Sequence, residues 1–148
     1  MPMREMTTKE IACFLTEQRV VRVCFHAFDQ LYLLPLDYVW ADGTLCGLGP
    51  RGRKITMGRA SPLVAFQVDN YTPATSPWVW QSVTGQGSFE LIGEGKETER
   101  LGAMIQARFS DVPEWFQRER AALAETMEFV FWRIVPAEMA GRALGPEE

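Results

Sequence analysis

The sequence predicts a mainly β protein, built as one small antiparallel barrel with a few helices. Apolar and polar residues alternate with a period of two in several segments, which is typical of strands with one buried face. Short turn signals such as Asp42-Gly43 separate neighbouring segments. The long segment 78–92 contains Gly85 and Gly87, where a strand can bend to close a barrel. We expect one domain, residues 1–148, long enough to bury a core without disulfide bonds.

Two elements begin the chain. Thr7 and Glu10 have the spacing of a capping box, so we expect a short amphipathic helix over residues 8–17. Residues 19–27 then alternate between apolar and polar side chains, which predicts a strand. The buried face of this strand would carry Val21, Val23 and Phe25.

Two further strands follow through tight turns. Residues 31–40 form an apolar segment, reached through a turn at 29–30, and its Pro35 needs a position where no ladder donor is required. The turn at 42–43 leads to a strand over residues 44–48. We therefore expect three antiparallel strands joined as a meander.

The second half of the chain supplies the remaining strands and two late helices. The pattern predicts helices over residues 55–60, 94–108 and 114–124, strands over 63–69, 78–92 and 127–135, and a loop over 70–77.

The composition excludes several classes of protein. A net charge of −4 argues against a nucleic-acid partner, because phosphate binding leaves a basic footprint. No apolar run has the length of a membrane span, so we expect no membrane contact and a cytoplasmic location. The three cysteines are odd in number and lack CxxC spacing, which predicts buried thiols and no metal site.

The segment Gly49-Pro50-Arg51-Gly52-Arg53-Lys54 carries the clearest chemical signal. Three cations and free backbone N–H groups at the start of a helix are what a phosphate group requires. The spacing matches neither a Walker loop nor a GxGxxG turn. A solvated basic turn is the alternative that spacing alone leaves open.

Several short motifs, taken in order, resemble the FMN-binding split barrels related to pyridoxamine 5'-phosphate oxidase. The resemblance covers about residues 7 to 92 and, more weakly, the last strand, and it is closest to the branch with the nitroimidazole-resistance proteins. It implies a six-stranded antiparallel split barrel that forms a homodimer with FMN at the subunit interface. The motifs are Pro35-Leu36-Asp37-Tyr38, Asp42-Gly43-Thr44-Leu45, Gly52-Arg53-Lys54-Ile55, Pro62-Leu63-Val64 and Trp80-Gln81-Ser82-Val83.

The resemblance assigns cofactor-binding roles to particular residues. It implies that Arg53 and Lys54 hold the FMN phosphate. The remaining residues would lie beside the flavin: Leu48 and Gly49 through their backbone, Leu36 and Tyr38 in the same groove, Trp80, Gln81 and Ser82 from the neighbouring chain, and Trp132 from the last strand. For Leu36, Tyr38 and Leu48 a plain core position is the alternative.

The function implied is an oxidoreductase that transfers hydride through flavin N5 to or from an unidentified small-molecule substrate. Leu48 and Gly49 stand where some nitroimidazole-resistance proteins have a functional histidine, which argues against that specific activity. The only histidine, His26, lies on the first long strand, where we expect a structural role. No catalytic side chain is assigned. The alternatives are a non-catalytic flavin-binding or storage module, or a barrel that holds haem or the deazaflavin F420.

Overall fold

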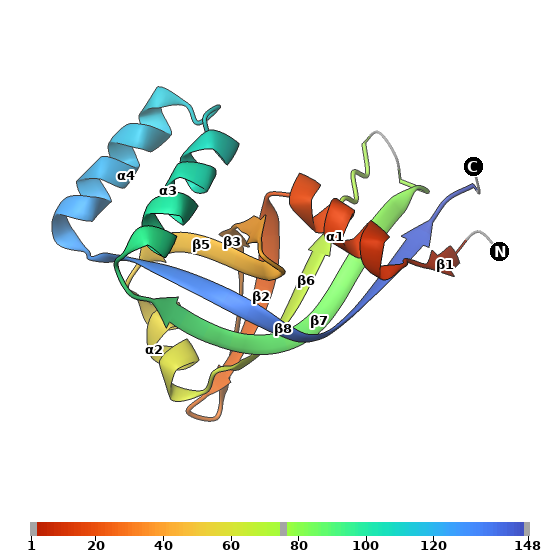
Figure 1. The fold of residues 1–148 in the computed structure, drawn as a ribbon, viewed down its shortest axis with the longest axis horizontal. Helices are drawn as coiled ribbons and strands as arrows, with labels where there is room; N and C mark the ends of the chain where they lie inside the picture. Colours follow the sequence, from red (N-terminus) through yellow and green to blue (C-terminus); the bar gives the residue numbers. More distant parts are fainter. Residues whose placement is uncertain (1–2, 75–76, 147–148) are drawn as a thin grey trace.

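Eight strands join in one antiparallel sheet within residues 3–74 and 77–146, which the computed structural model describes (Figure 1). The neighbour order is β3-β2-β6-β7-β8-β5-β4, and β1 pairs with β8. The strands are β1 (Met3–Glu5), β2 (Val20–Ala27), β3 (Gln30–Asp37), β4 (Val39–Ala41), β5 (Thr44–Pro50), β6 (Leu63–Asp69), β7 (Trp80–Ile92) and β8 (Phe129–Leu144). The helices are α1 (Thr8–Glu17), α2 (Arg53–Ala60), α3 (Lys96–Arg108) and α4 (Glu114–Thr126). Residues 75 and 76 of the expected loop lie outside the described residues.

The mainly β antiparallel prediction is confirmed, but the sheet has eight strands rather than six. The extra strands are the short β1 and β4. β4 exists because the chain breaks at Tyr38, within the segment expected to be one strand over residues 31–40. The Tyr38 side chain is fully buried, its N–H donates to the carbonyl of Arg19, and its hydroxyl donates to the carbonyl of Leu15.

That break makes the predicted meander wrong. β3 pairs with β2 and stays at one edge of the sheet, where Pro35 needs no second partner strand. β4 and β5 form a separate hairpin, and β5 then pairs with β8. β3 lies at one end of the strand order and β4 at the other, and the single residue Tyr38 connects them.

The local signals at the N-terminus are confirmed. Thr7 and Glu10 form both hydrogen bonds of the capping box at the start of α1. The Asp42–Gly43 turn has φ values of 52° and 75°. The β2–β3 turn lies at Phe28 and Asp29, one residue earlier than expected, with φ values of 54° and 55°.

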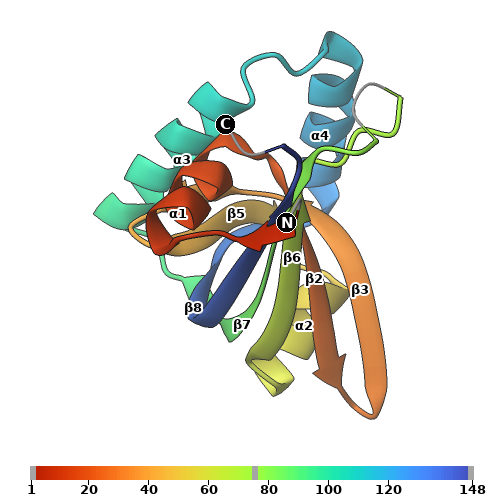
Figure 2. The same cartoon turned by 90° about the vertical axis from the view of Figure 1, so that its right-hand side faces the viewer.

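The long strands β7 and β8 run side by side through the middle of the molecule and curve strongly (Figures 1 and 2). β8 continues to Leu144, well past the expected end at residue 135. Gly87 pairs with Pro136 and Gln86 with Glu138, so Ala137 is the extra residue of a bulge. A bulge is one of the few places where a strand accepts proline.

The core fills the space inside the curved sheet, with a smaller cluster under α3. Of the three cysteines only Cys46 is buried, whereas Cys24 is partly buried and Cys13 is exposed, so the prediction of buried thiols is wrong for Cys13. The α3–α4 hairpin stands beside the sheet at the end opposite the two chain termini (Figure 1). In the part of the chain that the structure describes, no helix is long and apolar enough to cross a membrane.

Candidate functional site

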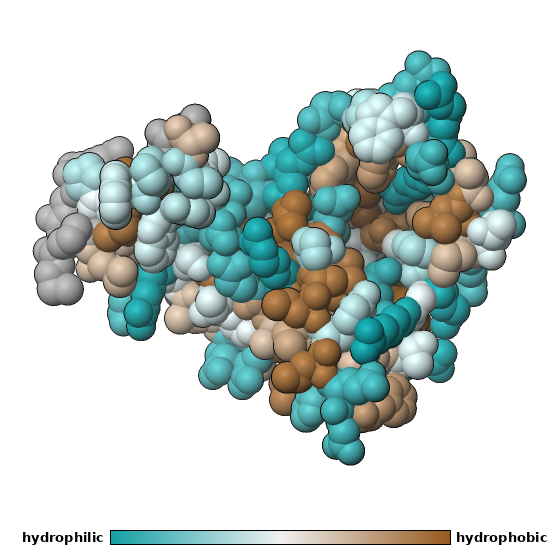
Figure 3. Space-filling model, turned by 180° about the vertical axis from the view of Figure 1, so that it is seen from behind, coloured by the Kyte–Doolittle hydropathy of each residue, from teal (hydrophilic) through white to brown (hydrophobic). Residues whose placement is uncertain are grey.

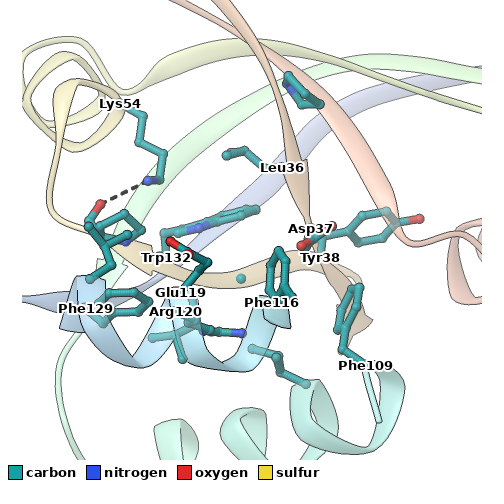
Figure 4. Close-up of a pocket in the computed structure, with 17 residues that line it drawn as sticks. Leu36, Asp37, Tyr38, Lys54, Phe109, Phe116, Glu119, Arg120, Phe129 and Trp132 are labelled. Atoms are coloured by element: carbon teal, nitrogen blue, oxygen red, sulfur yellow. Dashed lines mark hydrogen bonds between the residues drawn. The ribbon is translucent and has the colours of Figure 1, made fainter. Parts of the chain in front are cut away.

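A cavity of about 440 Å³ opens between the sheet and the α3–α4 hairpin (Figure 4). Its walls come from the end of β3, from β5, from the first turn of α2, from the facing sides of α3 and α4, and from the start of β8. These elements are far apart in the sequence. The break at Tyr38 is what places the end of β3 opposite β5.

The basic turn lies at one end of this cavity, and its three cations differ in their partners. The Arg51 guanidinium donates to the Glu128 carboxylate at 3.0 Å. Arg53 donates to the Gln30 side chain at 3.0 Å and stacks over the Tyr32 ring at 4.3 Å from the ring centre. Lys54 donates from Nζ to the Pro50 carbonyl at 3.0 Å. Among the described residues, only Arg51 of these three has a carboxylate partner.

Lys54 is an unusual lysine because it is only 8% exposed. Its burial lowers the pKa of the ammonium group, since a backbone carbonyl alone does not replace the lost water. The N-cap of the helix that carries it is Gly52, which has no side chain to cap the first N–H groups. A buried cation beside uncapped helical N–H groups is an arrangement that favours an anion.

Glycines allow the backbone of β5 to approach these groups closely. A Cβ atom at Gly49 would lie 3.1 Å from Lys54 Nζ. At Gly47 an added Cβ would overlap the Trp132 ring and lie 2.9 Å from the Asp37 carbonyl oxygen. Trp132, which is buried and stacked on Phe89 at 6.0 Å, forms the floor of the cavity.

Asp37 and Tyr38, at the end of β3, both line the cavity but differ in how far they are buried. Tyr38 lines the cavity, but its ring extends away from Trp132 and Lys54 (Figure 4), and burial raises the pKa of its hydroxyl. Asp37 lines the cavity as well. Partial loss of solvent raises the pKa of its carboxyl group, and the nearby Arg19 and Arg120 oppose that rise.

The structure brings together most of the site residues predicted from the sequence. Those that line the cavity are Leu36, Tyr38, Leu48, Gly49, Lys54 and Trp132. Arg53 does not line it but lies next to Lys54 at the start of α2. His26 lies on the outward face of β2, away from the cavity.

Trp80, Gln81 and Ser82 lie elsewhere, at the start of β7. Trp80 and Ser82 line a separate cavity of about 320 Å³ on the outward face of the sheet, together with Arg142 of β8. Gln81 exchanges hydrogen bonds with Asn70. Within one chain these three residues are not brought to Lys54.

Sequence reasoning missed the wall formed by the late helices. This wall depends on how α3 and α4 pack against the sheet, and the sequence patterns of strands and turns do not predict such packing. One signal was present: Phe116, Arg120 and Leu123 have i, i+4, i+7 spacing, which places a cation on an apolar stripe. The missed lining residues are Pro35, Asp37, Gly47, Pro50, Ile105, Phe109, Phe116, Glu119, Arg120, Leu123 and Phe129.

Comparison with known proteins places the chain in a family. The model of the pyridoxamine 5'-phosphate oxidase family matches residues 7–143. The chain belongs to this family. Among curated proteins, no sequence matches the chain.

Solved structures with the same fold confirm the expected split barrel. An FAD-binding protein from Mesorhizobium loti is 26% identical, with a TM-score of 0.77 over 97% of this chain and 98% of that chain. The haem storage protein HutZ from Vibrio cholerae is 14% identical, with a TM-score of 0.72 over 93% and 96% of the two chains. A protein provisionally assigned to 5-nitroimidazole antibiotic resistance, from Bacteroides thetaiotaomicron, is 14% identical, with a TM-score of 0.69 over 97% and 89%. The two matches at 14% identity show a shared fold and nothing further.

Proposed function

We propose that this protein is an FMN-binding oxidoreductase that acts as a homodimer. The observation that supports this most directly is the pair Arg53 and Lys54, which lie at the uncapped start of α2 without a carboxylate partner among the described residues. Lys54 is the more telling of the two because it is buried beside the cavity. A phosphate group would supply the missing anion.

The residues around the cavity suit the rest of a flavin. Leu36, Leu48 and Trp132 offer apolar surface, and Gly49 lets the backbone of β5 come close to a flat ring. A bound flavin supplies hydride transfer at its N5 atom. The chain itself would orient the cofactor, hold its phosphate and exclude water, and no side chain is assigned as an acid or base.

Among the other cofactors of such barrels, haem fits these residues less well than a flavin. Haem in many proteins takes a histidine ligand, and the only histidine here, His26, does not line the cavity. The Mesorhizobium loti relative is described as FAD-binding, and FAD shares the first phosphate that Lys54 would hold. Mass spectrometry of the flavin released from the purified protein separates FMN, FAD and F420, and its absorption spectrum reveals haem.

The proposed dimer would cover the outward face of the sheet. Leu31 and Leu33 on β3 are 72% and 67% exposed, and Leu63 on β6 is 61% exposed. Hydrophobic residues gather in the middle of the face seen in Figure 3. Apolar surface of this kind typically marks an interface. A two-fold contact would bury the same patch on both chains and would supply Trp80, Gln81 and Ser82 from the partner subunit.

A non-catalytic flavin store is the second candidate, because no catalytic side chain is assigned. Steady-state oxidation of NADH and NADPH by the flavin-loaded protein separates the two. Turnover above that of free flavin supports the oxidoreductase, and turnover at the level of free flavin supports the store.

Replacement of Lys54 tests the cofactor site. Lys54→Ala should weaken FMN binding by roughly tenfold or more, because one charge-assisted hydrogen bond is worth about 1.5–3 kcal/mol. Riboflavin, which lacks the phosphate, should lose little affinity. Arg51→Ala is the matched control, since Arg51 is already paired with Glu128. Equal FMN affinity of wild type and Lys54→Ala, measured by fluorescence quenching, would remove Lys54 from the site.

A further inference from the structure

The helix α4 contributes almost nothing to the core. None of its residues is buried, and the apolar residues on its cavity side, Phe116 and Leu123, are 37% and 39% exposed. Arg120 is partly buried, whereas every other residue of α4 is exposed. Covering a cation costs free energy unless something compensates its charge. The position of Arg120 therefore points to a role beyond packing.

Arg120 lies where two cavities meet. One is the cavity that holds Lys54, and the other, of about 580 Å³, lies between α3 and α4. Arg120 and Phe116 line both of them. Arg120 is thus accessible to a small molecule from either side of the hairpin.

The guanidinium of Arg120 has an aromatic neighbour but no ion pair in the part of the chain that the structure describes. It lies over the Phe129 ring, 5.6 Å from the ring centre. Arg118, two residues earlier on the same helix, pairs with Glu114 at 3.7 Å. Arg120 is close enough to Asp37 to oppose the rise of the Asp37 pKa, yet the two side chains form no salt bridge. The planar fork of donors on Arg120 is therefore available to a ligand.

The surroundings of Arg120 favour a flat organic molecule. Figure 4 shows Arg120 across from Trp132, with Phe116 and Phe129 on either side. Lys54, which would hold the cofactor phosphate, belongs to a different wall, formed by α2. Arg120 is therefore placed to serve a second ligand.

We infer that Arg120 determines specificity by binding the carboxylate of a small planar organic acid, the class of molecule that would meet the flavin in this cavity. This inference rests on the proposed function, because it takes the Lys54 end of the cavity as the cofactor end. A carboxylate matches the guanidinium fork with two parallel hydrogen bonds. The aromatic walls provide surface for a conjugated body.

A variant of Glu119 tests the inference a second time, with an expected effect of opposite sign. Its side chain lines the same cavity, next to Arg120 in the sequence. A like charge opposes an anionic ligand and favours a cationic one. Removing the Glu119 charge should therefore strengthen the binding of a carboxylate, whereas removing the Arg120 charge should weaken it.

The experiment uses benzoate as the probe and benzamide as its neutral counterpart. Binding to the FMN-loaded protein is measured by calorimetry and by the change in the flavin absorption spectrum. Arg120→Gln should weaken benzoate roughly tenfold to a hundredfold and leave benzamide unchanged. Glu119→Gln should strengthen benzoate severalfold. Arg118→Gln is the control, because it removes an exposed, paired arginine from the same helix.

Three outcomes would overturn the inference. If wild type binds benzamide as tightly as benzoate, or if Arg120→Gln keeps the benzoate affinity, Arg120 is not an anion site. If Arg120→Gln loses FMN to the same degree as Lys54→Ala, Arg120 belongs to the cofactor site instead. If wild type does not bind FMN, the proposed function fails. In that case the benzoate affinities of wild type and Arg120→Gln, both without FMN, are compared by calorimetry. A weaker affinity of the variant still supports an anion site at Arg120, and an equal affinity refutes it.

Discussion

Tyr38 shows how one buried residue can shape the site through its own hydrogen bonds. Its hydroxyl donates to the Leu15 carbonyl at 2.6 Å, and its ring is completely buried. These contacts fix the break between β3 and β4, which sets Leu36 and Asp37 against the cavity. The resemblance to the family implies a flavin contact for Tyr38, whereas its hydroxyl is already used inside the core.

Replacing Tyr38 with phenylalanine separates these two roles. Tyr38→Phe leaves the buried Leu15 carbonyl without this donor, so the free energy of unfolding should fall by about 1–3 kcal/mol. FMN affinity should stay within about twofold of wild type. Urea unfolding and flavin titration measure the two quantities. Tyr71→Phe, at a half-exposed position, serves as the control. A tenfold loss of FMN affinity with unchanged stability would show that Tyr38 serves the cofactor.

At the scale of elements, short-range signals predicted the structure well. The capping box of α1 and the Asp42–Gly43 turn depend on neighbouring residues only, and both are confirmed. The bulge at Ala137 depends on a partner strand far along the chain, and the strand predicted to end at residue 135 in fact continues through it to Leu144. The α4 wall of the cavity depends on tertiary docking in the same way. For that reason the sequence pointed to the Lys54 side of the cavity and not to the Arg120 side.

The capping box gives α1 a pH-dependent contribution to stability. The Arg4 side chain and the Thr7 N–H lower the pKa of Glu10 from 4.5 to about 2. A carboxyl group with a lowered pKa in the folded state stabilises the protein above its unfolded pKa, and that contribution is lost as pH falls through the folded value. Acid should therefore weaken α1 between pH 4.5 and about 2.

Glu10→Gln tests this prediction. The variant should be less stable than wild type at pH 6, and the difference should stay nearly constant down to about pH 5 and then shrink as the pH falls below 4.5 toward 3. Arg4→Gln should remove most of the same pH dependence, because Arg4 is the main cause of the low pKa. Urea midpoints at several pH values provide the measurement. A difference between Glu10→Gln and wild type that stays constant from pH 6 to 3 would contradict the assignment.

At the scale of the whole molecule, the predicted site residues fall on two faces of one sheet. Lys54 and Trp132 face the cavity beneath the α3–α4 hairpin, whereas Trp80 and Ser82 face outward beside Arg142. In one chain these sets are separate. A shared site requires a dimer in which Trp80 and Ser82 of one chain lie against the cavity opening of the other. The proposed cofactor site would then exist only in the dimer.

A mixed dimer tests whether the site is shared. One chain carries Lys54→Ala, the other carries Trp80→Ala and Ser82→Ala, and different affinity tags allow the heterodimer to be isolated. If each site takes Lys54 from one chain and Trp80 with Ser82 from the other, the heterodimer has one intact site and one doubly damaged site. It should then bind about half the flavin of the wild-type dimer, with wild-type affinity at the intact site. Because FMN would bind only the dimer, it should also shift the monomer–dimer equilibrium toward dimer by mass action. If the site lies wholly within one chain, no site of the heterodimer combines all three wild-type residues, and a heterodimer with no full-affinity site would refute the shared model.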